Sequence, residues 1–103
     1  MRNLLLPEAV LVVDIGNSNI VCAIYMKGKS VWTARLTSFK ENTSDEYYVL
    51  LSKLLESTTL SEVYKLGLKD IHYIALGSVV PELTRIWKHL CSKYIQAEVY
   101  EIN

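Results

Sequence analysis

The sequence predicts an α/β fold in which a mixed sheet of about five strands has helices packed on it. Three apolar segments in the first third of the chain are separated only by short turns, which predicts an antiparallel meander. Two later segments place apolar residues at helical spacing, and a strand-like run follows each of them. The predicted order of elements is therefore β-β-β-α-β-α-β, in a single domain that covers residues 1–103.

The strands are predicted from short runs that are rich in β-branched residues. These runs are residues 10–13, 20–25, 30–36, 71–76 and 97–102. The first is continuously apolar, which is typical of a strand that is covered on both faces. A turn around Gly28 separates the second from the third, and the apolar character of the fourth predicts a position inside the sheet.

The helices are predicted from their start signals and their apolar periodicity. Thr43-Ser-Asp-Glu46 has the form of a capping box, in which the Thr43 side chain and the Glu46 side chain each accept from the other residue's amide. The apolar residues that follow at helical spacing are Tyr47, Leu50, Leu51, Leu54 and Leu55. Pro81 suits the first position of a second helix, whose apolar stripe is Leu83, Ile86, Trp87, Leu90 and Tyr94. A short helix is also predicted over residues 60–68, closed by Gly67.

Composition excludes several classes of function. Eleven basic and eleven acidic residues cancel, so we expect no direct binding of nucleic acid or of an anionic membrane. No apolar run approaches the roughly 18–20 residues that span a bilayer, and residues 1–7 lack the pattern of an export signal. Cys22 and Cys91 are too few for a disulfide framework. We therefore expect a protein of the cytoplasm.

Residues 11–19, Leu-Val-Val-Asp-Ile-Gly-Asn-Ser-Asn, carry the clearest chemical signal. Asp14 ends a predicted strand, at the edge where ligands of such sheets tend to bind, and a carboxylate there can hold Mg²⁺ through its water shell. Gly16 allows the chain to turn and a phosphate to approach the backbone. The polar side chains and amides of residues 17–19 can donate to phosphate oxygens. A plain hairpin turn explains the same residues, because tight turns also favour Gly, Asn and Asp.

Two other segments have both a structural and a functional interpretation. Gly77-Ser-Val-Val-Pro81 joins a strand to a helix, with the Ser78 hydroxyl and a helix N-terminus that could attract an anion. A simple connection explains these residues equally well. Capping is a sufficient explanation for Thr43 and Glu46, and Asp45 fits the preference for acids in a first helical turn.

Three segments together resemble the type III pantothenate kinase family, which also includes Bvg accessory factor-like proteins. They are residues 12–21, 43–47 and 77–81, in the order and at about the spacing seen in that family. The resemblance implies the amino-terminal, ATP-phosphate-binding lobe of the actin-like ATPase (ribonuclease H-like) fold, which acetate kinase, sugar kinases, Hsp70 and actin share.

The resemblance also implies a transferase activity, the ATP-dependent phosphorylation of pantothenate to 4′-phosphopantothenate, which is the first step of coenzyme A biosynthesis. It assigns ATP phosphate binding to Asp14, Ile15, Gly16, Asn17, Ser18, Asn19, Ile20 and Val21. Asp14 would also hold Mg²⁺ through water, and Ser78 would lie on the substrate side. The other cofactors and partners that it implies are a monovalent cation (K⁺ or NH₄⁺), pantothenate, a second lobe of the same protein and a homodimer.

The sequence departs from the family at several points. It lacks the Gly-x-Asp-Arg segment with the family's catalytic aspartate, and it lacks the Asp-x-Gly-Thr-Ala phosphate motif. No catalytic residue is therefore assigned within the chain: the base and the second lobe are expected beyond Asn103, and the 103-residue chain alone is expected to be inactive. Glu41 and Asn42 stand where the family usually carries an arginine.

A different class of function is compatible with the same fold. The chain could be a regulatory or protein-interaction module, similar to the family's transcriptional activator-like members, without kinase activity. A third interpretation is an ordinary α/β domain in which the Gly-Asn segment is only a turn.

Overall fold

A computed structural model describes residues 8–58 and 66–102 of the chain. Its elements are β1 (Ala9–Ile15), β2 (Asn19–Met26), β3 (Lys29–Thr37), α1 (Ser44–Glu56), the 3₁₀ turn η1 (Leu68–Asp70), β4 (Tyr73–Ser78), α3 (Pro81–Leu90), the π-helical turn η2 (Cys91–Ile95) and β5 (Glu98–Ile102). The predicted order of strands and helices is confirmed. The short helix predicted over residues 60–68 lies outside the described residues, apart from its end at Leu66, Gly67 and Leu68.

The five strands form one mixed sheet in the order β3-β2-β1-β4-β5. β1 pairs antiparallel with β2, and β2 pairs antiparallel with β3, which confirms the meander. β4 is parallel to both β1 and β5, and so lies inside the sheet as predicted. Lys27 and Gly28 have φ values of 54° and 75°, the left-handed backbone that the tightest hairpin turns require.

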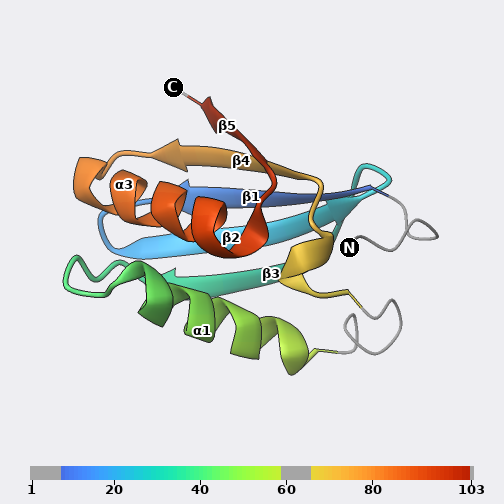
Figure 1. Ribbon diagram of the computed structural model, residues 1–103, viewed down its shortest axis with the longest axis horizontal. Coiled ribbons are helices and arrows are strands. Elements are labelled where there is room, and N and C mark those ends of the chain that lie inside the picture. The colour runs from blue at the N-terminus through green and yellow to red at the C-terminus, as the bar shows by residue number, and fades with distance from the viewer. Residues whose placement is uncertain (1–7, 59–65, 103) are drawn as a thin grey trace.

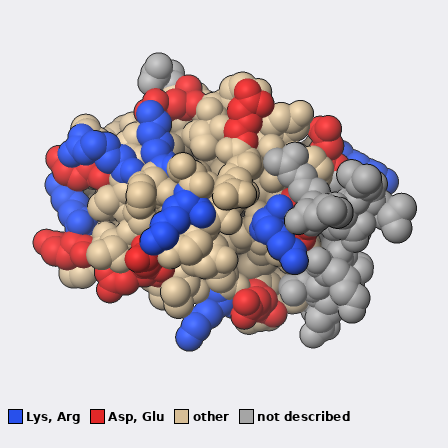
Figure 2. Space-filling model, in the orientation of Figure 1, with Lys and Arg blue, Asp and Glu red and all other residues tan. Residues whose placement is uncertain are grey.

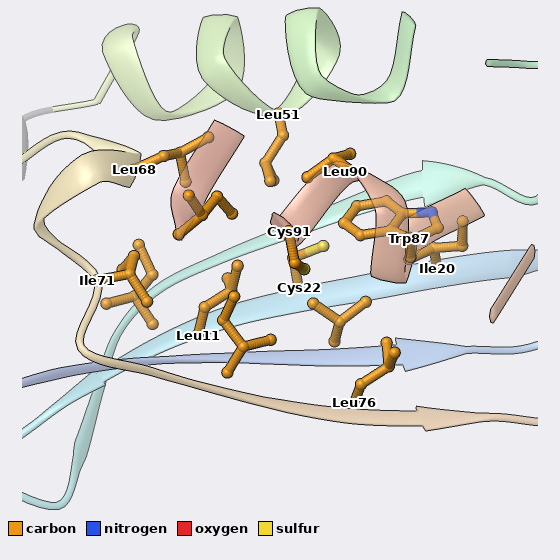
Figure 3. Packing of buried hydrophobic residues seen from close by; sticks show 14 of the residues in the cluster. Leu11, Ile20, Cys22, Leu51, Leu68, Ile71, Leu76, Trp87, Leu90 and Cys91 are labelled. Carbon is orange, nitrogen blue, oxygen red and sulfur yellow. The ribbon is translucent and has the colours of Figure 1, made fainter. Parts of the chain in front are cut away.

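Both helices cover the same face of the sheet (Figure 1). The core lies between the helices and the sheet, and Figure 3 shows part of it. Its largest fully buried side chains are Trp87, Tyr47, Leu11, Ile15, Ile20, Ile24, Leu51, Ile71, Ile74, Leu76, Leu83 and Leu90. Cys22 and Cys91 are free thiols that lie together in this core. Burial raises the pKa of Cys22 to about 12 and that of Cys91 to about 11, so both are protonated at neutral pH.

The other face of the sheet carries no helix among residues 8–58 and 66–102, which corrects the expectation that β1 is covered on both faces. On that face Val10 and Val12 are half-buried and Asp14 is exposed. Val10 lies between its register partners, Tyr25 on β2 and Tyr73 on β4. An apolar run alone cannot distinguish burial beneath a helix from shielding by neighbouring strands.

α1 begins as predicted, with Thr43 as its N-cap. The Glu46 amide donates to Thr43 Oγ1 at 3.1 Å, and the Thr43 amide donates to Glu46 Oε1 at 2.8 Å. The residues that face the core are Tyr47, Leu51 and Leu55. Leu50 and Leu54 were predicted on the same face but are 44% and 36% exposed, because the predicted stripe is wider than the line along which the helix contacts the core.

α3 begins at Pro81 as predicted, and Leu83, Trp87 and Leu90 are buried. Ile86 and Tyr94 pack against the edge of the core. Neither α1 nor α3, nor any other helix in the described part of the chain, is long and apolar enough to cross a membrane. Basic and acidic side chains are interspersed over the face that carries the helices (Figure 2).

The capping box gives a prediction about stability. Replacing Thr43 with alanine removes the acceptor of the Glu46 amide, and we expect it to lower the free energy of unfolding by about 1 kcal/mol. Thr43→Ser is the matched control, because it keeps the hydroxyl and should cost much less. Urea denaturation measures both values, and an equal loss in the two variants would contradict the capping assignment.

Asp45 gives a prediction about pH. Its carboxylate accepts hydrogen bonds from the Tyr94 hydroxyl and from Lys93 Nζ. Both bonds hold the pKa of Asp45 below its usual range, and the bond from Tyr94 has the larger effect. Because the pKa is lowered in the folded state, the stabilisation is present above the unfolded-state pKa and is lost as the pH falls through the folded-state pKa. We expect the stability difference between wild type and Asp45→Asn to shrink below about pH 3.9, the ordinary aspartate value. Chemical denaturation at a series of pH values measures this difference, and a constant difference would rule out the ion-paired carboxylate.

Candidate functional site

The carboxyl ends of β1 and β4 meet at one edge of the sheet, at the left in Figure 1. The two strands are parallel, with Asp14 opposite Gly77 and Ile15 opposite Ser78. The Val79 amide donates to the Ile15 carbonyl at 3.1 Å, which continues the pairing past the end of β4. The structure therefore brings together two of the segments that the sequence singled out. We call residues 14–19 the corner.

The turn of the corner presents backbone amides at this edge. The Gly16 amide donates to the Asn19 carbonyl at 2.9 Å, which closes the turn between β1 and β2. Asn17 and Ser18 are exposed at its tip. Their amides form no hydrogen bond with any of the residues that the structure describes. Successive free amides at a turn make a concave site that suits an anion.

Glycine is favoured at position 16 by a close contact rather than by its backbone conformation. Among the described glycines only Gly28 has a positive φ. A Cβ atom on Gly16 would lie 3.2 Å from the Asn19 carbonyl oxygen, closer than ordinary van der Waals contact. Gly16 therefore lets the backbone at position 16 lie close to the Asn19 carbonyl at the base of the turn.

Asp14 lies on the face of the sheet that is opposite the helices, and its side chain is exposed. Within the described residues it forms no hydrogen bond or ion pair. Its register partners are Val21 on β2 and Gly77 on β4, and Gly77 has no side chain to cover it. The carboxylate is therefore accessible from solution.

The residues around Asp14 determine which metal they could hold. No group of three or more His, Cys, Asp or Glu side chains in the described parts of the chain is arranged to hold a metal ion. One accessible carboxylate beside free amides fits Mg²⁺, which keeps most of its water and is commonly bound jointly by one or two carboxylates and the phosphates of a nucleotide.

Not every side chain of the predicted set points toward this edge. Ile15 and Ile20 are 1% and 0% exposed, so only their backbone atoms can contact a ligand. Val21 is half-buried beside Asp14.

The sequence suggested a free hydroxyl at Ser78, but in the structure this hydroxyl is engaged. Ser78 Oγ accepts from the Val80 amide at 3.0 Å and donates to the Val80 carbonyl at 3.1 Å. Ser78 thereby shapes the entry into α3.

Sequence reasoning missed one residue that contacts the corner, Ser38. It follows β3 directly, and it donates from its hydroxyl to the Gly16 carbonyl and from its amide to the Ser18 carbonyl. The predicted meander placed the end of β3 at this edge, but only the register of β2 with β3 shows the contact.

A separate hollow of about 180 Å³ lies between α1, η1 and η2, and its lining includes Tyr48, Ser52, Leu68 and Tyr94. The corner is an open edge of the sheet and not a cavity of this kind. We place the candidate site at the corner because the accessible carboxylate and the free amides are found there.

A family model described as type III pantothenate kinase matches residues 10–103. The chain belongs to the type III pantothenate kinase family. A relative of that name from Kosmotoga olearia is 36% identical over 88 residues, which is 85% of this chain and 31% of the relative. Another from Brevibacillus brevis is 34% identical over 94 residues, which is 91% of this chain and 34% of the relative. The chain thus spans about a third of the length of the relatives that it matches.

Solved structures give the fold. A Bacteroides thetaiotaomicron protein with an actin-like ATPase fold superposes with a TM-score of 0.60 at 14% identity, covering 96% of this chain and 34% of that protein. YeaZ from Pseudomonas aeruginosa gives a TM-score of 0.57 at 12% identity, covering 93% of this chain and 43% of YeaZ. The predicted fold class, an actin-like ATPase lobe with a mixed five-stranded sheet, is confirmed.

The two glycines at this edge give a paired prediction. Alanine at position 16 must displace the Asn19 carbonyl, whereas alanine at position 77 meets no described atom within 4 Å. We expect Gly16→Ala to be less stable than Gly77→Ala by about 1 kcal/mol, a modest overpacking cost. Urea denaturation of the two variants measures the difference, and equal stabilities would mean that the turn has room for a side chain.

Proposed function

We propose that the corner binds the phosphates of ATP, as part of a kinase that phosphorylates pantothenate to 4′-phosphopantothenate, the first step of coenzyme A biosynthesis. One observation carries this proposal: the amides of Asn17 and Ser18, which bond to none of the described residues, belong to the turn that directly follows an accessible carboxylate, Asp14, at the carboxyl end of β1. Membership of the type III pantothenate kinase family supports it. The proposed ATP-binding residues are Asp14, Ile15, Gly16, Asn17, Ser18, Asn19, Ile20 and Val21.

Phosphoryl transfer depends mainly on positioning and on neutralising charge. In this proposal Asp14 would hold Mg²⁺ through the ion's water shell, and the bound ion would offset the negative charge of the phosphates. The amides of Asn17 and Ser18 donate to phosphate oxygens. Ile15 and Ile20 would contact the ATP phosphates through backbone atoms. Their buried side chains hold that backbone in place.

We further propose that this chain supplies only one wall of the complete site. A second lobe, the base that orients the pantothenate hydroxyl, and a monovalent cation (K⁺ or NH₄⁺) would complete it, in a cytoplasmic homodimer. Family membership supports these features. Ser78 would line the substrate side through the shape of its turn, because its hydroxyl is engaged by Val80.

Asp14 provides the test of the proposed function. Isothermal titration calorimetry on the protein as its gene encodes it should show binding of Mg·ATP. Asp14→Asn should weaken that binding roughly ten- to hundredfold, which corresponds to the loss of a hydrogen bond to a charged group. Asp45→Asn is the matched control, because Asp45 is an exposed aspartate bonded to Lys93 and Tyr94. Mg²⁺ without nucleotide should give no heat of binding.

Two results would contradict parts of this proposal. Unchanged Mg·ATP binding in Asp14→Asn would remove the corner from the nucleotide site and would favour the regulatory alternative. Robust phosphorylation of pantothenate by residues 1–103 alone would show that the chain holds a complete site and not one wall.

A further inference from the structure

We infer that Ser38 and Tyr47 are positioning residues that hold the corner in the shape that binds phosphate. This inference rests on the proposed function of the corner. It concerns Ser38, which follows β3 and contacts the corner directly, and Tyr47 on α1, which bonds to the backbone of the next residue, Phe39.

Ser38 is bonded to the corner twice. Its hydroxyl donates to the Gly16 carbonyl at 2.6 Å, and its amide donates to the Ser18 carbonyl at 2.9 Å. Both carbonyls belong to the turn that joins β1 to β2. One residue therefore binds the turn at two alternate peptide units.

Binding these carbonyls also sets the direction of the amides. A peptide unit is planar and trans, so its C=O and its N–H point in opposite directions. The Gly16 carbonyl shares a peptide unit with the Asn17 amide, and the Ser18 carbonyl shares one with the Asn19 amide. When Ser38 draws the Gly16 carbonyl toward β3, the Asn17 amide turns away from β3, and a repulsive carbonyl dipole is kept from an approaching phosphate.

Ser38 is itself held from both sides. The residue before it, Thr37, pairs with Asn19 in the sheet. The residue after it, Phe39, is bound by the Tyr47 hydroxyl, which accepts from the Phe39 amide at 2.8 Å and donates to the Phe39 carbonyl at 2.8 Å. The Phe39 side chain is 51% exposed. Hydrogen bonds to its backbone, rather than burial of its ring, fix this residue.

Tyr47 is a rigid anchor for this contact. It is fully buried, and its ring centroid lies 5.3 Å from that of Trp87. A phenol held by packing loses little further freedom when its hydroxyl bonds to Phe39. Hydrogen bonds thus connect Tyr47 in the core to Phe39. Ser38, the residue before Phe39, is in turn bonded to the carbonyls that set the direction of the corner's amides. This gives the tyrosine of the 43–47 segment a role that capping does not explain.

The test uses two variants and a matched control for each. Ser38→Ala removes the hydroxyl that donates to Gly16, and Tyr47→Phe removes both bonds to Phe39 while keeping the ring. Ser57→Ala is the serine control, because Ser57 Oγ donates to the Leu54 carbonyl at 2.9 Å at the opposite end of α1. Tyr94→Phe is the tyrosine control, because the Tyr94 hydroxyl donates to Asp45 and not to the backbone of Phe39.

We expect the dissociation constant of Mg·ATP, measured by calorimetry on the protein as its gene encodes it, to rise about three- to tenfold in Ser38→Ala and in Tyr47→Phe. This is the range that corresponds to the loss of one neutral hydrogen bond. The two controls should stay within about twofold of wild type by the same reasoning. Ser38→Thr, which keeps the hydroxyl, should restore the affinity.

Positioning can be separated from a general loss of structure. All measurements are made below the melting temperature of each variant, and steady-state assays should show a higher KM for ATP with an unchanged KM for pantothenate. A smaller folded fraction would instead lower the apparent kcat and leave both KM values alone. If Tyr47→Phe does not fold, Ser38→Ala and Ser38→Thr decide the inference by themselves.

The outcomes also separate this inference from the proposed function. Wild-type affinity in both Ser38→Ala and Tyr47→Phe, with a clear loss in Asp14→Asn, would overturn the positioning role and leave the phosphate site standing. Wild-type affinity in all three, or no binding of Mg·ATP by the unmodified protein, would overturn both. A loss in Ser38→Ala that Ser38→Thr does not restore would also count against the hydroxyl contact.

Discussion

The geometry of the corner depends on the pairing of β1 with both of its neighbours. β1 is antiparallel to β2 and parallel to β4, so its register fixes Asp14 and Ile15 against Val21 and Ile20 on one side and against Gly77 and Ser78 on the other. A slip by one residue would exchange the two faces of the strand. It would expose Val13 and Ile15, which are each 1% exposed, and bury Asp14. Because burying one such side chain stabilises the fold by about 1.5–3 kcal/mol, the core holds the carboxylate of Asp14 toward solution.

The core also positions the corner through a series of hydrogen bonds. Tyr47 packs against Trp87, and its hydroxyl holds the backbone of Phe39. Ser38, the preceding residue, binds two carbonyls of the turn. Hydrophobic packing gives position without direction, whereas these hydrogen bonds give direction to individual peptide units. Packing and hydrogen bonds together allow an exposed turn to keep a defined shape. A turn that is already ordered loses less conformational freedom when a ligand binds.

Most of the fold could be predicted from the sequence because local patterns determine it. The capping box at Thr43, Pro81 at the start of α3 and the turn at Gly28 each act within a few residues. Longer-range features could not be read in this way. The exposure of Leu50 and Leu54 depends on where α1 meets the core. The contact of Ser38 with the corner depends on the register between strands that adjoin in the sheet, and the engagement of the Ser78 hydroxyl depends on how the chain turns into α3.

The most direct test of the central claim is to map the backbone amides that respond to Mg·ATP. Two-dimensional NMR spectra of the ¹⁵N-labelled protein, as its gene encodes it, would be recorded with and without Mg·ATP. We predict that the largest chemical-shift changes fall at Asn17 and Ser18, with smaller changes at their neighbours in β1 and β2. Changes centred instead on the hollow lined by Tyr48, Ser52 and Leu68, with the corner unaffected, would contradict the assignment of the corner as the phosphate site.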